Sequence, residues 1–341
     1  MTRFGARRRL ATISGINASI GKVTSFIVYA FMFRSYCLRL LWHCFNSLSR
    51  GAANVLLLLS NMSLTRRTFL GSAVAAAAGA QVVSAQNKSI PIGLELFSVR
   101  SALLADPMGT VKKVAGIGYQ VVEFYSPYYD WKIDQIRDMK KLMDDLGIVC
   151  HSTHNGTASF QSANLQKTIE WNHALGGKFV VLASSTQSRD PDVWKKLASD
   201  TLAPALDTLR AAGLRGGYHN HQTEFTPLPN GQKPMEILAA NTPKDFMLQL
   251  DVGTCVEVGS DPVAWVNANP GRINSMHLKD WNKERGYRVL FGEGSVPWKP
   301  LLAAAEKTGG AEYLLIEQEG SDYSEFETAQ RCLDNYRKMV G

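Results

Sequence analysis

Short apolar segments alternate with longer helical patterns along residues 90–317, and the alternation recurs about eight times. Apolar segments of this length, separated by amphipathic stretches, indicate strands that each lead into a helix. The strand candidates are residues 90–96, 120–124, 148–153, 179–183, 214–219, 246–251, 273–278 and 313–317. Strands that alternate with helices form a parallel sheet, and eight repeats favour closure of that sheet over an open, doubly wound one. The sequence therefore predicts an α/β fold, a single (β/α)8 TIM barrel.

Helical periodicity is seen between these segments, for example at residues 133–146, 165–175, 193–212 and 263–267. Three of these stretches are followed at once by Gly147, Gly176 or Gly213. Glycine readily adopts the left-handed conformation that closes many helices, so we expect helix ends there. No GxGxxG sequence opens any of the helices, which argues against a dinucleotide-binding fold.

Nearly every predicted strand ends in an ionisable side chain. The set comprises Glu123, His151, His154, His219, His221, Asp251, His277 and Glu317. In a (β/α)8 barrel the carboxyl ends of the strands meet on one face, and active sites lie on that face. We therefore expect these side chains to converge.

A metal site is predicted at the last four strands, where the ligand candidates are His219, Asp251, His277 and Glu317. Two imidazoles and two carboxylates suit a divalent cation such as Mn, Co, Zn or Mg. Such a cation polarises a carbonyl or a pair of hydroxyls on a sugar and assists proton transfer. The alternative for each residue taken singly is an ordinary polar group at the barrel rim.

The segment GYHNHQTEF, residues 217–225, places several polar groups at the end of the fifth predicted strand. Residues two apart in a strand share a face, so His219 and His221 point together and Asn220 points away. We interpret His219 as a metal ligand, His221 as a group that binds substrate or supports the ligand, and Glu224 as an orienting or acid–base group. The alternative is that His221 and Glu224 only hydrogen-bond the loop to the barrel rim.

A long polar loop, residues 281–298, follows the seventh predicted strand and is expected to fold over the barrel mouth. Lys279, Trp281 and Glu293 are its candidate substrate-binding residues, with an ion pair between Lys279 and Asp280 as the alternative for the lysine. Aromatic side chains here and after the second strand would form a wall for the apolar face of a sugar, or else pack as core. They are Tyr125, Tyr128, Tyr129, Trp131, Trp281, Tyr287 and Trp298.

The first 85 residues carry ten Lys or Arg and no Asp or Glu, which leaves 27 basic and 30 acidic residues in the remainder. The basic character belongs to this leader, so no nucleic-acid partner is expected. Residues 62–85 contain Arg66 and Arg67, an Ala-rich apolar stretch and a small-residue site ending at Ala85, a pattern typical of a twin-arginine export signal. Residues 1–61 lack any such pattern and are interpreted as a misplaced upstream start or a leader, with a membrane anchor as the alternative.

Cleavage after Ala85 leaves residues 86–341, a length typical of one TIM barrel. We expect the mature protein to be periplasmic or secreted, without stable membrane insertion. Its Cys150, Cys255 and Cys332 are odd in number and form no CxxC pair, which favours buried thiols over a disulfide framework.

Segments along the whole mature chain resemble the sugar phosphate isomerase/epimerase branch of the xylose isomerase-like TIM-barrel superfamily. They are IGLELFSVR, YHNHQTEF, LQLDVGTCVEVGSDPV, RINSMHLKDW, FGEGSVPW and YLLIEQE. The resemblance implies a divalent metal held by Glu, Asp, His and Glu from the fifth to eighth strands, with the two glutamates also acting as acid and base. Asp251, His277 and Glu317 match this pattern, but His219 stands where many relatives have the first glutamate, and Thr254 stands where a histidine is frequent.

With His219 at that position, a second proton-transfer group beside Glu317 must come from elsewhere, and Glu224, Glu123 and His154 are the candidates. The resemblance favours a metal-dependent isomerase or epimerase that acts on a keto sugar or related polyol through an enediol. The alternatives are a metal-dependent lyase or hydratase acting on 3-keto-glycosides, which the missing glutamate and the export signal favour, and a non-catalytic carbohydrate-binding barrel. The expected partner is a small carbohydrate, and a homodimer stays open.

Overall fold

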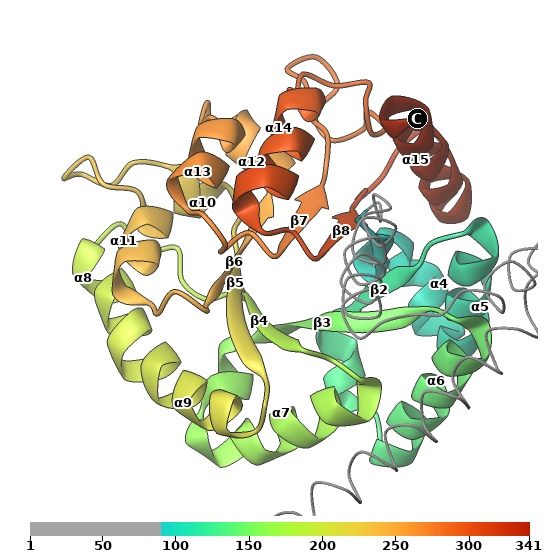
Figure 1. Cartoon of the computed structure of the whole chain (residues 1–341), viewed down its shortest axis with the longest axis horizontal. Coiled ribbons are helices and arrows are strands. Elements are labelled where there is room, and N and C mark those ends of the chain that lie inside the picture. Colours follow the sequence, from blue (N-terminus) through green and yellow to red (C-terminus); the bar gives the residue numbers. More distant parts are fainter. Residues whose placement is uncertain (1–89) are drawn as a thin grey trace, which may run out of the picture. The chain divides into compact units, whose positions relative to one another are not determined.

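The computed structural model describes residues 90–341, so the predicted leader, export signal and cleavage site lie outside the described residues. Eight parallel strands close into a barrel in chain order (Figure 1). The strands are β1 (Ile92–Glu95), β2 (Val121–Phe124), β3 (Val149–Gly156), β4 (Phe179–Ser184), β5 (Arg215–His219), β6 (Met247–Asp251), β7 (Ser275–Leu278) and β8 (Tyr313–Ile316). Each overlaps one of the predicted strands, and the predicted TIM barrel is confirmed.

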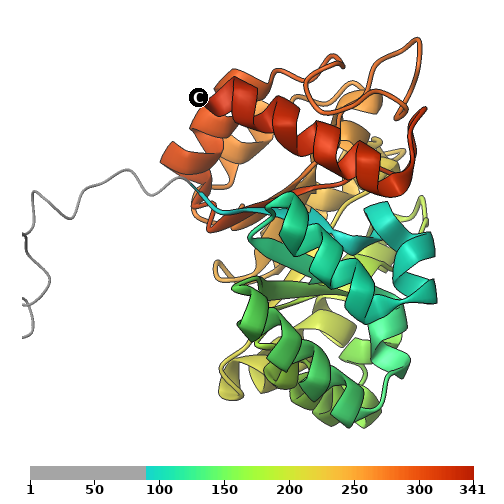
Figure 2. The same ribbon diagram turned by 90° about the vertical axis from the view of Figure 1, so that its right-hand side faces the viewer.

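Helices cover the outside of the barrel, as two views at right angles show (Figures 1 and 2). The α-helices are α4 (Arg100–Ala105), α5 (Pro107–Ile117), α6 (Ile133–Leu146), α7 (Ser162–Leu175), α8 (Pro191–Lys196), α9 (Ala203–Ala211), α10 (Gln222–Phe225), α11 (Pro234–Asn241), α12 (Val252–Glu257), α13 (Pro262–Ala268), α14 (Trp298–Ala304) and α15 (Glu325–Val340). Residues 90–341 also contain the short 3-10 helices η1 (Leu96–Val99), η2 (Ser126–Asp130) and η3 (Thr157–Phe160) and the π-helical segments η4 (Leu197–Leu202) and η5 (Ala305–Gly309). Among residues 90–341, no helix is both long and apolar enough to cross a membrane.

The expected helix ends are found where glycine follows the periodic stretch. Gly147, Gly176 and Gly213 have φ of 68°, 82° and 77°. The helical pattern of residues 193–212 is instead divided into α8, the π-helical segment η4 and α9. Pro204 lies in the first turn of α9 and has no N–H for the regular helical bond, which accounts for the wider turn just before it.

The interior of the barrel changes character along its axis. Side chains of a strand alternate between the helix layer and the interior, and a small apolar cluster fills the interior separately from the main core. Its members are Val121, Phe179, Val181, Met247, Tyr313 and Leu315. Two residues further along the same faces come Glu123 after Val121 and Glu317 after Leu315. The interior is therefore apolar towards the amino ends of the strands and polar at their carboxyl ends.

Candidate functional site

A pocket of about 380 Å³ opens at the carboxyl ends of the strands. Its lining brings together Glu95 from β1, His154 from β3, His219 from β5 and Glu317 from the end of β8. His221, which follows β5, lines it too. Four of the eight predicted strand-end side chains thus line one cavity, namely His154, His219, His221 and Glu317. His151 does not join them, because its ring lies against Tyr313 of the apolar interior cluster.

The predicted metal ligands lie side by side at this end of the barrel. His219, Asp251 and Glu317 each offer one ligand atom, and these atoms lie within 4.8 Å of one another. His277 Nδ1 lies 2.6 Å from Glu317 Oε2, so the imidazole and the carboxylate present neighbouring atoms. His219, Asp251 and His277 are all at most 2% exposed. A small cation would therefore be enclosed by protein groups from four neighbouring strands.

Unpartnered polar atoms in this cluster fit a cation. His219 Nδ1 is buried without a hydrogen-bond partner, and Asp251 Oδ2 also accepts no hydrogen bond, although the Lys279 ammonium lies 2.9 Å from it. A buried polar atom without a partner costs free energy unless something else satisfies it. Burial, together with the nearby His277 and His154, holds the pKa of His219 well below its usual value, so its imidazole is neutral. Neutral imidazole and ionised carboxylate are the forms that bind divalent metals.

A carboxylate orients His277 from behind. Glu123, completely buried in β2 one residue before its end, lies 2.7 Å from His277 Nε2, which leaves Nδ1 directed towards Glu317. Carboxylates commonly hold the far nitrogen of a metal-binding histidine in this way. In the metal-free protein, burial is outweighed by Glu123 and Glu317, which raise the pKa of His277 to about 10. Metal binding at Nδ1 would therefore release a proton.

Lys279 lies inside the cluster as a competing cation. Its Nζ is 2.9 Å from Asp251 Oδ2, without hydrogen-bond geometry, and 3.2 Å from Glu317 Oε1 and 2.5 Å from Glu319 Oε1. Burial lowers the pKa of Lys279, but these carboxylates hold it well above its usual value. A divalent cation would share Asp251 and Glu317 with this ammonium. Lys279 is buried in a carboxylate network and does not line the pocket, and its partners are not the expected Asp280.

Of the additional proton-transfer candidates, only His154 lines the pocket. Its Nε2 lies 2.7 Å from Gln249 Oε1 and 3.0 Å from Glu123 Oε2, and its Nδ1 lies 3.8 Å from Glu95 Oε1. Glu123 accepts a hydrogen bond from Gln249 in addition to contacting the two histidines, so its oxygens are occupied below the pocket. The nitrogens of His154 and His277 therefore come together on one buried carboxylate.

Glu224 is used to fold the loop after β5. Its carboxylate accepts hydrogen bonds from the Tyr218 hydroxyl at 2.7 Å and from the His221 backbone N–H at 2.8 Å, and the second bond caps α10. The side chain is buried and is not part of the pocket lining. Glu224 thus only hydrogen-bonds the loop to the barrel, which was the alternative interpretation for this residue. His221 does line the pocket, and its ring lies edge-on to that of His219.

The loop of residues 281–298 contributes Tyr287 to the pocket, and neither Trp281 nor Glu293 lines it. Tyr287 is held by its hydroxyl, which bonds Glu257 and Gln222. Glu293 accepts from the backbone N–H of Leu290 within its own loop. Asp280 anchors the base of the loop through backbone N–H groups and the Trp298 indole.

The expected aromatic wall is therefore smaller than predicted. Tyr125 and Tyr287 line the pocket, together with Phe97, which packs edge-on against Tyr125. Tyr128 and Trp298 are buried in the core instead. The described cysteines, Cys150, Cys255 and Cys332, are free and buried, as expected.

Sequence reasoning missed Glu95, which ends β1 and lines the pocket. It is 1% exposed, and neither carboxylate oxygen has a hydrogen-bond partner. Burial, opposed by His154 and reinforced by Glu123, raises the pKa of Glu95 to about 8. The strand period contained the signal, because Glu95 lies two residues after Gly93, which faces Val121 and Leu315 of the interior cluster.

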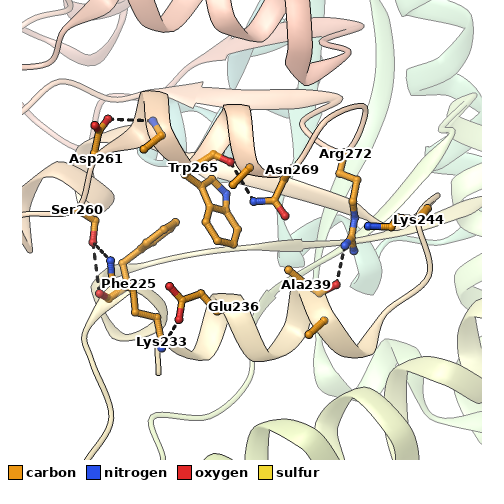
Figure 3. Close-up of a pocket in the computed structure, with 13 residues that line it drawn as sticks. Phe225, Lys233, Glu236, Ala239, Lys244, Ser260, Asp261, Trp265, Asn269 and Arg272 are labelled. Carbon is orange, nitrogen blue, oxygen red and sulfur yellow. Dashed lines mark hydrogen bonds between the residues drawn. The ribbon is translucent and has the colours of Figure 1, made fainter. Parts of the chain in front are cut away.

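A second cavity of about 510 Å³ lies on the outside of the barrel between α11 and α13 (Figure 3). Phe225 and Trp265 contribute its aromatic surface. Arg272 in its wall donates to backbone carbonyls of Ala239 and Phe246, and Lys233 bonds Ser260. None of the strand-end histidines lines this cavity, so the candidate active site is the pocket at the barrel mouth.

Comparison with known proteins gives related enzymes at low identity. The chain is 24% identical over 179 residues to an inosose dehydratase from Lacticaseibacillus casei, a match that covers 43% of this chain and 59% of that protein. It is 23% identical over 266 residues to an inosose dehydratase from Mesomycoplasma hyopneumoniae, covering 67% of this chain and 87% of the relative.

Solved structures share the fold. A sugar phosphate isomerase/epimerase from Parabacteroides distasonis superposes with a TM-score of 0.62 at 23% identity, covering 73% of this chain and 94% of the other. The IolI protein with a bound zinc atom superposes with a TM-score of 0.57 at 16% identity, covering 74% and 98%. The model of the family described as xylose isomerase-like TIM barrel matches residues 111–338. With its closed eight-stranded barrel and its polar cluster at the strand ends, this chain belongs to the xylose isomerase-like TIM barrel family.

Proposed function

We propose that this protein is a divalent-metal-dependent lyase that removes a proton next to the carbonyl of a keto sugar or keto cyclitol and expels water or an alcohol from the neighbouring carbon. The observation that carries the proposal is the buried set of His219, Asp251 and Glu317, whose ligand atoms lie within 4.8 Å of one another beside the barrel-mouth pocket. A bound divalent cation would polarise the substrate carbonyl and acidify the adjacent C–H bond.

The residues around the pocket have distinct tasks in this reaction. His219, Asp251, His277 and Glu317 would hold the cation, and Glu123 fixes the orientation of His277. His154 is the base that takes the proton, because it alone among the additional candidates lines the pocket. Phe97, Tyr125 and Tyr287 present aromatic surface to the apolar face of the sugar and exclude water.

Elimination is favoured over epimerisation by the proton-transfer groups available. An epimerase needs a proton acceptor or donor on each face of one carbon. Here His219 stands where the family pattern has its first glutamate, and Glu317 is paired with His277 and Lys279. These pairs, working against burial, keep the pKa of Glu317 below its usual value and make it a weak base. The inosose dehydratases among the relatives support the same choice.

An isomerase or epimerase is the second candidate. Glu317 and His154 both line the pocket; Glu317 directly follows β8 and His154 lies in β3, and these two strands are not neighbours in the barrel. A substrate between them would meet one proton-transfer group on each side, as an epimerase requires.

Turnover in deuterated water distinguishes the candidates. The metal-loaded protein, residues 86–341, is incubated with 3-keto-glucosides and keto-inositols, and the products are analysed by mass spectrometry and ultraviolet absorbance. We expect loss of alcohol or water and a conjugated enone. A sugar recovered with unchanged composition but with inverted configuration at a deuterated carbon would favour the epimerase, because exchange without inversion also follows from reversible proton abstraction by a lyase. Neither reaction on any of these substrates would contradict the enzyme proposal and favour a carbohydrate-binding barrel.

We also propose that the protein is exported by the twin-arginine route, with cleavage after Ala85, on the strength of Arg66 and Arg67 and the apolar stretch that follows. Expression of residues 62–341 in a bacterium with an active twin-arginine pathway should deliver a periplasmic protein whose first residue is Gln86. Replacement of Arg66 and Arg67 by Lys should retain the precursor in the cytoplasm. Export of that variant at the level of the unchanged chain would contradict this route.

A further inference from the structure

Glu95 occupies a position in the pocket that none of the proposed roles uses. It ends β1, next to β8, and lines the cavity together with His154, His219 and Glu317. The side chain is 1% exposed, so its carboxyl group is enclosed at the wall of the site.

Its lack of partners separates Glu95 from the other buried acids of the site. Glu123 contacts Gln249 and two histidines, Asp251 accepts from the Thr254 N–H, and Glu317 is paired with His277 and Lys279. Both oxygens of Glu95 lack a hydrogen-bond partner, and the nearest imidazole nitrogen, His154 Nδ1, is 3.8 Å away.

An unpaired buried carboxylate is costly, so Glu95 remains a neutral carboxylic acid. The pKa of about 8 agrees with this state, because burial is its largest cause. A neutral carboxylic acid offers an O–H donor, and this one has no protein acceptor. A glutamate with a purely structural role would be expected to accept hydrogen bonds from its neighbours, as Glu224 does.

We propose that Glu95 is the general acid of the site, which protonates the oxygen that leaves from the substrate. The inference rests on the proposed lyase function and assigns it a proton donor. In the elimination, the base takes the proton from the carbon next to the carbonyl and the C–H electron pair forms the new C=C bond. The C–O bond breaks, its electron pair stays on oxygen, and the Glu95 proton converts that oxygen to water or alcohol. The protonated base or solvent then returns a proton to the Glu95 carboxylate.

The acid role predicts a dependence on the leaving group. We compare Glu95→Gln with the unchanged protein on 3-keto-glucosides that release methanol or 4-nitrophenol. Methoxide leaves poorly without a proton, so kcat for the methyl glycoside should fall roughly 10²- to 10⁴-fold. Nitrophenolate leaves without help, so the nitrophenyl glycoside should lose less than about tenfold. Exchange of the carbon-bound proton in deuterated water should continue, because it needs only the metal and the base.

Controls separate this inference from the lyase proposal. Metal content and circular dichroism of Glu95→Gln should match the unchanged protein and Glu306→Gln, a change at an exposed position remote from the pocket. Glu95→Asp retains an acid, so its kcat on the methyl glycoside should lie between that of the unchanged protein and that of Glu95→Gln. This variant keeps the test informative if Glu95→Gln folds poorly. If kcat of Glu95→Gln fell equally on both glycosides, or fell on neither, the acid role would be overturned. Absence of exchange and elimination in the unchanged protein would instead overturn the lyase proposal.

Discussion

Glu95 at the end of β1 pairs with Glu123 of β2, and only their surroundings make them different acids. Both are buried, but Glu123 lies within 3.0 Å of two imidazoles, which hold its pKa below the usual value against the effect of burial. Glu95 has no such neighbour at hydrogen-bond distance, and burial raises its pKa. Ionised glutamate orients a histidine, whereas neutral glutamic acid can donate a proton.

The ligand roles are tested by metal content. We expect His219→Ala and His277→Ala each to lose the bound divalent ion, because each removes one imidazole from the cluster. Elemental mass spectrometry of the purified variants measures this, with the exposed His173→Ala as the matched control. Metal retained at the level of the unchanged protein in His219→Ala would remove His219 from the ligand set.

The raised pKa of Glu95 predicts a pH-dependent stability. Between its usual value of 4.5 and about 8, the unfolded chain has released the proton that the folded, metal-free chain retains. The unfolded state binds fewer protons there, so the free energy of unfolding falls as pH rises, relative to Glu95→Gln. Both proteins are treated with a chelator and denatured with urea between pH 5 and 9, in steps of roughly one pH unit. These measurements give the difference in free energy of unfolding between the unchanged protein and Glu95→Gln. A difference that stays constant over this range would contradict protonated, buried Glu95.

At the scale of single elements, the polar residues at the carboxyl ends of the strands depend on close contact between the strands lower in the barrel. Gly93 pairs with Val121 of β2 and Leu315 of β8. A Cβ at Gly93 would overlap the Val121 carbonyl oxygen and lie 2.7 Å from Val121 Cβ and 2.8 Å from Leu315 Cδ2. Glycine here lets β1 close the barrel and brings Glu95 into the pocket.

We therefore expect Gly93→Ala to lower the free energy of unfolding by about 1–3 kcal/mol, because a methyl group overpacks the barrel interior. Gly116→Ala is the control, since a Cβ there meets nothing within 4 Å inside α5. That change should leave stability unchanged or raise it by up to about 1 kcal/mol. Chemical denaturation measures both. Equal stabilities of the two variants would show that β1 can shift to accommodate the methyl group.

At the scale of the whole molecule, the candidate metal ligands His219, Asp251, His277 and Glu317 join strands from the second half of the barrel. A ligand that binds only the folded state raises stability in proportion to the logarithm of its concentration, by about 2.7 kcal/mol at 100 times its dissociation constant. We expect chelation to lower the unfolding temperature and one divalent ion per chain to restore it. Uptake should release a proton and strengthen as pH rises towards 10, because His277 has a pKa of about 10 without metal.

Calorimetric titration in buffers of different ionisation enthalpy measures that proton release. Unfolding temperatures before and after chelation measure the stabilisation. A chain whose unfolding temperature does not respond to chelation or to added Mn, Co, Zn or Mg would contradict the metal centre.

The sequence by itself determined the barrel and the group of strands that carries the polar residues. Residues 133–146 form α6 as predicted, and Gly147 ends it in the left-handed conformation, because helix period and glycine conformation are local properties. The same two-residue period that places Val121 in the interior places Glu123 there too. Fold and convergence therefore followed from short-range rules.

Only the tertiary structure decided which polar groups have partners. Glu123 and His277 are 154 residues apart, and Lys279 meets Glu319 across 40 residues, so no local pattern shows that these charges neutralise one another. The Tyr218 hydroxyl donates a hydrogen bond to the Glu224 carboxylate, whereas the Glu95 carboxyl group has no hydrogen-bond partner among the described residues. The state of a buried acid is set by the distance to charges and donors on other strands, and those distances exist only once the barrel has closed.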